Sequence, residues 1–269
     1  AVLGLSRLLR GQKVDILNTH SSLDSWVGLL ANLGRRSRTK LIRTRHLSTP
    51  IRTSWPTRWL YQSPDAIITT GQAIKALIMA RAGVPAGRIY SLPTGVALER
   101  FFPRPGDRRA DFLPPGFADG CLIGCVAVLR SWKGHLYLVE ALRHLLDAGA
   151  SARLVLVGEG PYRVVIEAKI AELNLGEAVF LAGYRDDVPD WLARMDIVVL
   201  ASYANEGVPQ ALLQAMALAR PVVGTLCGGI PEIVTPGVNG LLVPPKDPLA
   251  LAAALLELIP DPVRCQEFG

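Results

Sequence analysis

The sequence has little of what marks a membrane-spanning or disulfide-rich protein. Its 269 residues include four cysteines, with no Cys-x-x-Cys pair and no histidine at a metal-ligand spacing from them. The most apolar stretch, Leu249 to Ile259, is shorter than the roughly 18–20 residues of a spanning helix and carries Glu257. We therefore expect no spanning helix and no metal site, and free thiols in a reducing compartment.

The composition also excludes disorder and collagen-like repeats. Half of the residues are apolar and 19% are charged, which is typical of a chain that buries a core. At roughly 150 residues per domain, the length suits one large or two modest domains. The chain begins at Ala1, in what reads as the middle of a helix, without the features of a signal peptide. We expect a piece of a longer protein.

Acidic residues are scarce in the first part of the chain. Residues 1–103 hold 15 lysines and arginines against four acidic residues, whereas residues 104–269 hold 14 against 19. The basic run comprises Arg35, Arg36, Arg38, Lys40, Arg43, Arg45, Arg52 and Arg58, with Trp55, Trp59 and Tyr61 near its end. Such a stretch suits an anionic partner, although basic clusters also occur on plain solvated faces. Because no nucleic-acid-binding signature accompanies it, we favour an anionic membrane surface contacted through residues 35–61 over nucleic acid.

Short β-branched runs alternate with amphipathic helical stretches along the whole chain. About four strands are expected before residue 103, at 14–20, 40–46, 65–70 and 88–92, and about six after residue 120, at 122–129, 152–158, 179–183, 196–202, 221–225 and 240–245. Strand–helix alternation with short apolar strands favours parallel α/β sheets buried on both faces.

A Pro-, Gly- and charge-rich segment divides this alternation. We predict an N-terminal Rossmann-like domain at 1–103 that is incomplete, a linker at 104–120 and a C-terminal Rossmann-like domain at 121–269. Two doubly wound parallel sheets of this kind bind ligands at the carboxyl ends of their strands, in the cleft between the domains.

The most specific segment is ASYANEGVPQALLQAMALARPVVGT. A strand is expected to end at Ser202, a loop carries Glu206, and a helix begins near Pro209, where a missing N–H costs nothing. The first amides of that helix favour an anion, and Glu206 and Gln214 can accept hydrogen bonds from hydroxyls. Taken alone, however, a glutamate before a helix is usually a cap or a solvated charge.

An ordered set of blocks resembles the family 4 retaining glycosyltransferases (glycosyl transferase group 1), which have the GT-B architecture of two facing Rossmann-like domains. The family signature is a Glu, seven residues, a second Glu, an Ala-Met-Ala helix and a Gly-Gly-x-Pro-Glu turn, and it corresponds here to EGVPQALLQAMALARPVVGTLCGGIPEIV. IGCVAVLRSWKGHLYLVEAL, LVLVGEGP, LAGYRDDVPDWLARMDIVVLAS and IYSLPTGVALERFFP agree in order and spacing, so the resemblance extends from Val14 to Leu255.

The resemblance implies site residues in both domains. They are His20, Arg45 and His46 on the acceptor side and, on the donor side, Arg130, Lys133, Gly158, Gly160, Tyr184, Arg185, Glu206, Gly207, Val208 and Gln214. Lys133 matches the contact to the donor diphosphate, Glu206 faces the hydroxyls of the donor sugar, and His46 lies beside the transferred sugar. These three are the expected catalytic residues.

Several positions depart from the family pattern. The second Glu of the signature is Gln214, which bonds a diol without charge. The Arg five residues before the Lys is replaced by Val128, and Arg130 is the substitute we expect from the loop, since a guanidinium grips a diphosphate bidentately. The first strand with its Gly-rich loop, and the last helices of the family, are absent from this sequence.

The resemblance implies transfer of a sugar from a nucleotide-diphosphate sugar to a glycan or lipid-linked acceptor, with retention of configuration, in cell-envelope polysaccharide or lipopolysaccharide synthesis. No metal is expected, because basic side chains and amides can neutralise the diphosphate. The expected place is the cytoplasm, peripheral at the inner face of the plasma membrane. A GT-B epimerase or phosphorylase, and a non-catalytic remnant that binds a nucleotide or a partner, remain as alternatives.

Overall fold

The computed structural model describes residues 1–33, 39–103, 113–117 and 119–269. They form two units, Ala1–Thr94 and Gly95–Gly269, so the division precedes the expected end of the first domain at residue 103. Most of the expected linker, 104–120, lies outside the described residues, as do Arg35, Arg36 and Arg38 of the basic run.

Unit 1 is a four-stranded parallel sheet whose strands follow one another in sequence order. The strands are β1 (Ile16–Thr19), β2 (Lys40–Arg45), β3 (Ala66–Thr69) and β4 (Ile89–Ser91). The helices are α1 (Val2–Gly11), α2 (Ser22–Asn32), α3 (Trp55–Gln62) and α4 (Gln72–Ala82), with a 3-10 turn at η1 (Ala86–Arg88). Ile67, Ile74 and Ile78 are fully buried and join β3 to α4.

The start of α2 follows directly from the sequence. Ser21 precedes the helix and its hydroxyl accepts a hydrogen bond from the Asp24 amide, while the Asp24 carboxylate accepts one from the Ser21 amide. This reciprocal capping box satisfies amides that the first helical turn leaves open. It places the N-terminus of α2 immediately after the carboxyl end of β1.

Unit 2 is a six-stranded parallel sheet in the order β10-β9-β8-β5-β6-β7. The strands are β5 (Cys121–Val126), β6 (Ala152–Val157), β7 (Val179–Gly183), β8 (Ile197–Leu200), β9 (Val222–Thr225) and β10 (Gly240–Val243). The chain runs outward from β5 in one direction, returns, and runs outward in the other. This is the doubly wound order of a Rossmann-type domain.

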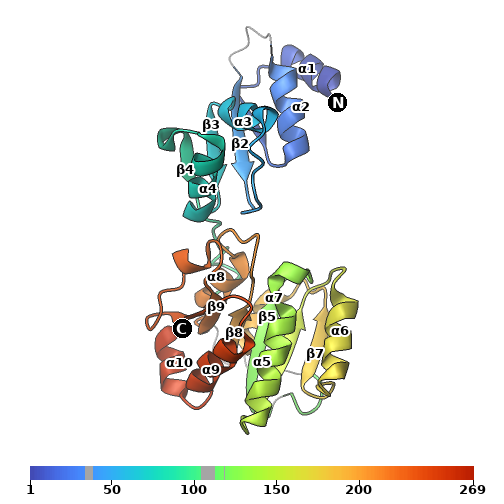
Figure 1. Cartoon of the computed structure of the whole chain (residues 1–269), viewed down its shortest axis with the longest axis vertical. Helices are drawn as coiled ribbons and strands as arrows, with labels where there is room; N and C mark the ends of the chain where they lie inside the picture. Colours follow the sequence, from blue (N-terminus) through green and yellow to red (C-terminus); the bar gives the residue numbers. More distant parts are fainter. Residues whose placement is uncertain (34–38, 104–112, 118) are drawn as a thin grey trace. The chain divides into compact units, whose positions relative to one another are not determined.

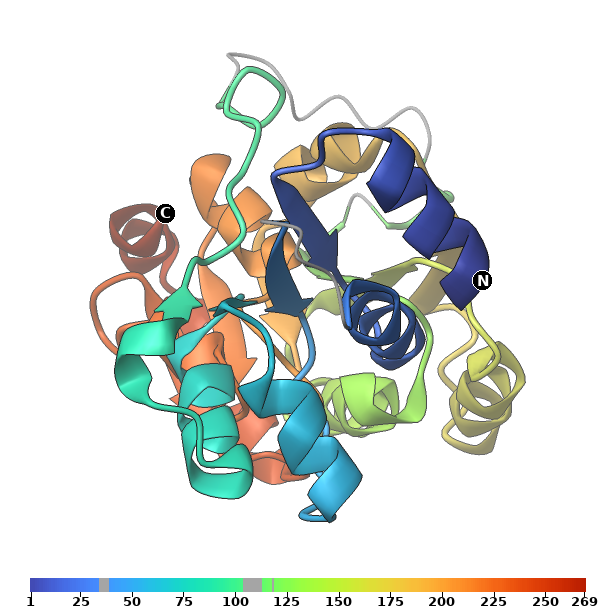
Figure 2. The same cartoon turned by 90° about the horizontal axis from the view of Figure 1, so that it is seen from above.

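Helices cover both faces of this sheet, as Figures 1 and 2 show. The elements are η2 (Ser131–Lys133), α5 (His135–Asp147), α6 (Arg163–Glu172), α7 (Val188–Arg194), α8 (Gln210–Ala217), η3 (Ile230–Glu232), α9 (Pro248–Leu258) and α10 (Pro262–Phe268). Helix α5 packs between α6 and α9 on one face, and α7 and α8 adjoin each other on the other. Consequently β8 and β9 are buried along their whole length, as parallel strands between two helical layers are.

The predicted parallel α/β class is confirmed, and the sheets contain four and six strands. Some element bounds differ from the expected ones. Strand β8 ends at Leu200 and not at Ser202, because the chain beyond it pairs with a loop: the Tyr203 amide donates to the Trp132 carbonyl at 2.9 Å. Pro209 immediately precedes α8 in an extended conformation and is not part of its first turn.

Close packing of the central strand of unit 2 gives a prediction on stability. Gly124 lies in β5, where an added Cβ would overlap the side chain of Met195. We expect Gly124→Ala to lower the free energy of unfolding by roughly 2 kcal/mol, a typical cost of overpacking, in urea titrations followed by circular dichroism. The matched control is Gly176→Ala, which meets no atom within 4 Å. Equal midpoints for the two variants would contradict the packing seen at Met195.

Candidate functional site

The candidate site of unit 2 lies where the strand order reverses. Strands β5 and β8 are neighbours in the sheet, but the chain leaves them in opposite directions. Their carboxyl ends lead into two loops, residues 127–134 after β5 and residues 201–209 after β8. Ligands of doubly wound domains bind at such a point.

Lys133 and Glu206 are brought together from these two loops. The Lys133 ammonium forms an ion pair with Glu206 Oε1, and the Ser202 hydroxyl donates to the same oxygen at 2.8 Å. Glu206 is only 4% exposed, whereas the Lys133 side chain retains 21% of its exposure. Thr225, at the end of β9, donates its hydroxyl to the Ser202 carbonyl. A cation and a buried carboxylate are thus held together from the ends of three adjacent strands.

Two glycine positions allow the backbones of these loops to approach one another. Gly134 has φ 74°, and a Cβ there would overlap the Ala201 carbonyl at the end of β8. Gly228 has φ 54°, and a Cβ there would overlap the Glu206 carbonyl. A side chain at either position would separate the loops as well as strain the backbone. The Gly228–Gly229 turn therefore backs the segment that carries Glu206.

The expected Gly-rich loop packs beside the first of these loops. A Cβ on Gly158 would overlap the Ala127 carbonyl, and one on Gly160 would overlap the Leu129 carbonyl. The Leu129 amide donates to the Glu159 carbonyl at 2.9 Å. Gly158 and Gly160 therefore lie against the loop that leads to Lys133, one strand away from it in the sheet.

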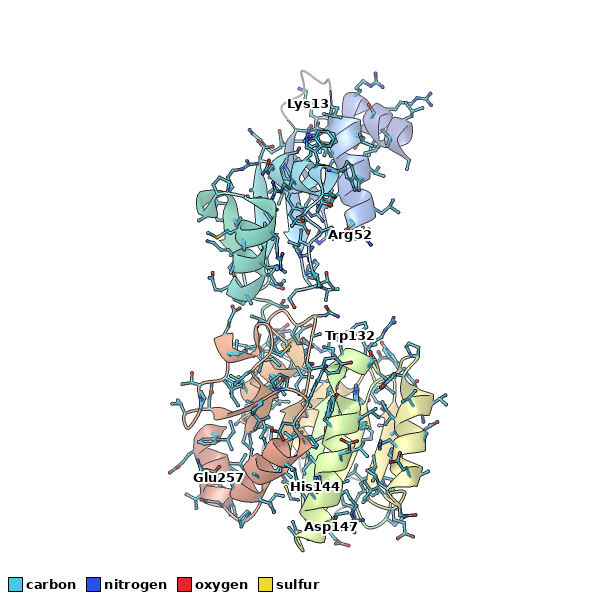
Figure 3. All side chains as sticks on the ribbon, in the orientation of Figure 1. Lys13, Arg52, Trp132, His144, Asp147 and Glu257 are labelled. Atoms are coloured by element: carbon cyan, nitrogen blue, oxygen red, sulfur yellow. The ribbon has the colours of Figure 1, made fainter. Side chains whose placement is uncertain are left out.

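Arg130 lies in the same loop as Lys133. Its guanidinium lies 5.6 Å from the centre of the Trp132 ring, and no hydrogen bond to it is found among the described residues. Figure 3 shows Trp132 at one end of α5 and His144 and Asp147 at the other. Arg130 and Lys133 are thus two cationic residues of the loop that follows β5.

Tyr184 and Arg185 follow β7, at the same edge of the sheet. The Tyr184 side chain is 72% exposed and donates to Asp186 at 2.7 Å, and Arg185 makes a two-pronged ion pair with Asp187 at 2.8 Å. Because its guanidinium is already engaged, Arg185 has fewer donors to offer than its place in the motif suggests. Neither residue has a contact with Lys133 or Glu206 in the described structure.

Gly207 and Val208 are buried between Glu206 and α8, and Gln214 lies half-buried in the middle of that helix. Helix α8 thus begins directly after the carboxylate. Its first amides have no side-chain cap, so the N-terminal end of its dipole favours a negative charge near this loop.

Unit 1 brings together two of the three residues expected on the acceptor side. His20 follows β1, His46 follows β2, and their rings stack with Nδ1 of His20 3.0 Å from Nε2 of His46. One of these nitrogens donates and the other accepts. Arg45 is directed elsewhere: its guanidinium donates to the Tyr61 hydroxyl and to Thr49. The sequence therefore predicted the histidines as individual residues but not their direct contact.

Sequence reasoning missed Ser202 and Thr225, which hold Glu206 in place. Both are buried polar residues at strand ends. Their position at the end of an apolar strand is the feature of the sequence that could have identified them. His135 was missed as well. His135 is the first residue of α5 and is 1% exposed. Burial lowers the pKa of His135 to about 4, with a further lowering from the Lys133 charge and an opposing effect of the Arg130 backbone.

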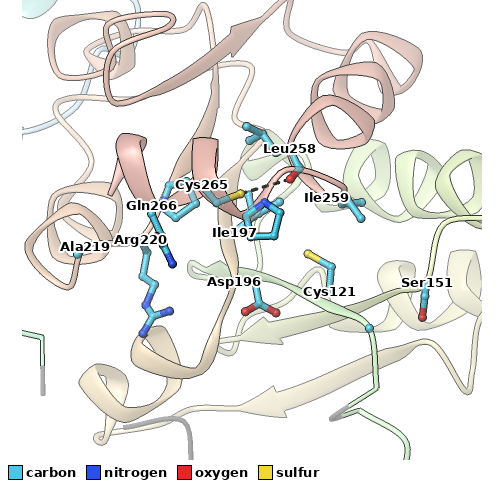
Figure 4. A pocket seen from close by; sticks show the side chains of 13 residues that line it. Cys121, Ser151, Asp196, Ile197, Ala219, Arg220, Leu258, Ile259, Cys265 and Gln266 are labelled. Carbon is cyan, nitrogen blue, oxygen red and sulfur yellow. Dashed lines mark hydrogen bonds between the residues drawn. The ribbon is translucent and has the colours of Figure 1, made fainter. Parts of the chain in front are cut away.

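Unit 2 also has a cavity away from this site. It has a volume of about 500 Å³ and lies at the opposite edge of the sheet, where β5 and β8 begin. Figure 4 shows Cys121, Asp196 and Cys265 in its lining. The Asp196 carboxylate accepts from the Leu122 amide at 2.8 Å, and burial raises the pKa of the Cys121 thiol to about 12. These groups support the sheet and carry no reactive thiolate.

Two further features concern metals and membranes. Among the described residues, no three acidic, histidine or cysteine side chains gather in a way that could hold a metal ion. Within the same ranges, every helix is too short or too polar to cross a bilayer. All four cysteines carry free thiols.

Comparison with known proteins adds to this geometry. Residues 120–261 match the family described as glycosyl transferases group 1, and residues 1–100 match glycosyltransferase family 4. A putative colanic acid biosynthesis glycosyltransferase of Escherichia coli, WcaL, is 35% identical over 182 residues, which are 65% of this chain and 43% of that protein.

A GDP-mannose-dependent phosphatidylinositol monomannoside mannosyltransferase of Mycolicibacterium smegmatis is 31% identical over 69% of this chain and 50% of its own length. The chain therefore spans about half the length, or less, of these two relatives. The crystal structure of Anabaena HepE with UDP has a TM-score of 0.87 at 24% identity, over 99% of this chain and 74% of that one. This likeness establishes the same fold.

The buried histidine beside the site gives a prediction on pH dependence. Because the pKa of His135 is about 4 in the folded chain and 6.5 as a free side chain, the unfolded chain binds a proton that the folded chain excludes. The contribution of His135 to the free energy of unfolding is therefore fully present above pH 6.5. It is lost as the pH falls toward 4, by at most about 1.4 kcal/mol per pH unit.

His135→Leu removes this contribution, so the free energy of unfolding should fall less steeply between pH 6.5 and 4 than in the parent chain. His144→Leu, in the last turn of the same helix, should keep the parent slope. Urea titrations at each pH measure both. Identical slopes for all three chains would mean that protonation of His135 does not change the free energy of unfolding.

Proposed function

Because the chain belongs to the group 1 glycosyl transferases, glycosyltransferase family 4, we propose that its protein moves a sugar from a nucleotide-diphosphate sugar to a glycan or lipid-linked acceptor with retention of configuration. The observation that carries this proposal is the Lys133–Glu206 pair at the reversal point of a doubly wound sheet. A diphosphate needs a cation there, and a sugar needs a hydrogen-bond acceptor beside it.

The donor class is supported by the chemistry of the loops and by the relatives. The mycobacterial relative is described as GDP-mannose-dependent, and HepE was solved with UDP. In this chain Lys133 and Arg130 offer positive charge to a diphosphate, the first amides of α8 offer N–H donors, and Glu206 offers oxygens to sugar hydroxyls. We propose that these charges suffice and that the reaction needs no metal.

The ion pair makes the site responsive to its ligand. In the structure the Lys133 charge is balanced by Glu206, so a bound diphosphate must share the ammonium with a buried carboxylate. Ser202 keeps Glu206 in position through its hydrogen bond of 2.8 Å. Donor binding would then leave Glu206 oriented and partly released from Lys133, with its second oxygen directed to the sugar.

The proposed chemistry is a displacement at the anomeric carbon. The acceptor oxygen forms a bond to that carbon, the bond from carbon to the diphosphate oxygen breaks, and the acceptor proton passes to a phosphate oxygen on the same face. Lys133 and Arg130 stabilise the charge that develops on the departing diphosphate, which is stronger in the transition state than in the ground state. We propose that His46 orients and polarises the reacting groups, with His20 fixing its ring through the 3.0 Å contact.

The acceptor and the cellular place are further parts of the proposal. WcaL is described as a colanic acid biosynthesis enzyme, which supports a role in cell-envelope polysaccharide or lipopolysaccharide synthesis. The basic run of unit 1 supports a peripheral place at the inner face of the plasma membrane, where anionic headgroups attract lysine and arginine.

Calorimetric titration with UDP, GDP and ADP, without added metal, tests the donor site directly. Saturable binding of one nucleotide at one site supports the proposal and names the base. Product detection with that nucleotide's sugars and a panel of lipid acceptors then separates a transferase from a remnant that only binds, and release of a free epimerised sugar would favour an epimerase. Binding of none of the three by the folded chain would contradict a working donor site in unit 2.

Lys133→Ala tests the contact to the diphosphate. A charged hydrogen bond contributes about 1.5–3 kcal/mol, so we expect the dissociation constant of the nucleotide to rise about ten- to a hundredfold, with an unchanged circular dichroism spectrum. Lys169→Ala is the matched control, because it removes one ammonium from α6, where Lys169 pairs with Glu140 and Glu172. An unchanged dissociation constant in Lys133→Ala would remove Lys133 from the site.

His46→Gln tests the reacting side. We expect the rate of sugar transfer to fall roughly a hundredfold, the lower range for loss of a group that assists proton movement, while nucleotide binding stays at the parent value. His20→Gln should produce a smaller loss, since His46 remains. His144→Gln serves as the control for a histidine outside the site. Full activity in His46→Gln would show that the histidine pair is a structural contact within unit 1 and takes no part in the reaction.

A further inference from the structure

The basic run of unit 1 is not one solvated surface. Arg58 is exposed on α3, whereas Arg43 is only 3% exposed and lies with its guanidinium 4.0 Å from the centre of the Tyr61 ring. Arg45, two residues on, is half-buried and donates to the Tyr61 hydroxyl. Side chains two residues apart on a strand share a face. Both guanidinium groups therefore enter the same space between β2 and α3.

That space is a cavity of about 280 Å³. Arg43, Arg45 and Arg52 contribute to its lining, together with Tyr61, Trp26 and Ser22, and the lining contains no acidic side chain. Figure 3 labels Arg52, which follows β2 in unit 1. The volume is close to the lower end of the range for ligand sites, so the cavity suits one small polar group.

The positive charge in this cavity has no carboxylate partner. Nη1 of Arg43 and Nε of Arg45 are buried without a hydrogen-bond acceptor, and none of the three arginines has an ion pair in the described part of the chain. Asp24 is the acidic residue whose charge favours the protonated Arg43, but its carboxylate accepts from the His20 and Ser21 amides. Buried arginines without a carboxylate are rare, since removing a guanidinium from water is costly unless an anion accompanies it.

We propose that this cavity of unit 1 is a binding site for a phosphate monoester group, separate from the donor site of unit 2. A phosphate monoester carries a charge of about −1.5 to −2 at pH 7, which matches the two guanidinium groups at the back of the cavity. Its oxygens accept bidentate hydrogen bonds from arginine. The Ser22 hydroxyl and the exposed Arg52 supply further donors at the cavity lining.

A carboxylate fits less well, because it brings a single charge and two oxygens to a site with two cations, the buried Arg43 and the half-buried Arg45. The Tyr61 ring stabilises Arg43 through its face, and this contact keeps the guanidinium in place for the anion. The proposal concerns unit 1 only. It holds whether or not a nucleotide binds in unit 2.

Calorimetric titration with inorganic phosphate tests the proposal. It is done on the full chain carrying Lys133→Ala, so that phosphate binding near Lys133 does not contribute. We expect one site in this chain, and binding at least about tenfold weaker when Arg43→Met is added, because a charge-assisted hydrogen bond is lost. Arg58→Met removes the same charge from the same basic run outside the cavity and should leave the dissociation constant unchanged. Acetate at equal ionic strength should bind more weakly than phosphate.

Thermal unfolding distinguishes a binding role from a structural one. If Arg43 binds an anion, Arg43→Met leaves the melting temperature without phosphate unchanged or higher, because an unpaired buried charge is removed, and it abolishes the rise that phosphate causes in the parent. Arg43→Lys keeps the positive charge but lacks the paired N–H donors of a guanidinium, so it should bind phosphate with intermediate strength. If Arg43→Met lowers the melting temperature and phosphate has no effect on the parent, Arg43 is structural and the proposal is wrong.

The source of the phosphate group is resolved by two further probes. Glucose 1-phosphate and geranyl phosphate present the same group on a sugar and on a lipid, and Arg43-dependent binding of either supports the proposal. Vesicles of phosphatidylcholine with phosphatidylglycerol provide the opposing test. Vesicle binding that falls equally in Arg43→Met and Arg58→Met, with no binding of the soluble phosphates, would show a diffuse charged surface and overturn the phosphate site.

Discussion

The reversal of strand order at β5 and β8 is the constraint on which the candidate donor site depends. Two neighbouring parallel strands send the chain to opposite sides, and the loops that follow them lie at the sheet edge where doubly wound domains bind ligands. Here the Gly134 backbone lies against the Ala201 carbonyl, and the Gly228 backbone lies against Glu206. The position of Lys133 relative to Glu206 therefore results from backbone packing. This packing is possible because Gly134 and Gly228 have no side chain.

A buried ion pair contributes less to stability than its short contact suggests, because both charges lose water. The Lys133–Glu206 pair is better understood as a positioning device. Glu206 is held by two donors, Lys133 and Ser202, and Ser202 is held in turn by Thr225. An anionic ligand that attracts Lys133 leaves the hydroxyl contact intact. Glu206 then has an orientation that does not depend on the cation alone.

Much of this arrangement could be predicted from the sequence, since strand–helix alternation identifies parallel sheets and motif spacing places Lys133 and Glu206 at strand ends. Their mutual contact could not, because it depends on which strands are neighbours, and β5 and β8 are separated in sequence by two other strands. The support from Ser202 and Thr225 was missed for the same reason. Their hydroxyls gain a role only when β8 and β9 lie side by side.

The histidines and arginines of unit 1 show a second limit of sequence reasoning. The family resemblance implied His20 and His46 individually, and the parallel pairing of β1 with β2 brings their rings together. Arg43 and Arg45 were read as part of a charged run, because arginine is usually exposed. Alternation along β2 directs both toward α3, where Tyr61 covers them.

The two units thus use positive charge in different ways. In unit 2 the Lys133 charge is compensated by a carboxylate, so the site can exchange one anion for another without leaving a cation unpaired. In unit 1 no carboxylate among the described residues compensates Arg43 and Arg45, which contact the Tyr61 ring and, through Arg45, the Tyr61 hydroxyl and Thr49. A compensated cation suits an anionic ligand that must be released, because the carboxylate pairs with the ammonium again when the ligand leaves. Uncompensated arginines suit a group that is retained, since its release would leave the buried Arg43 and the half-buried Arg45 without a counter-ion.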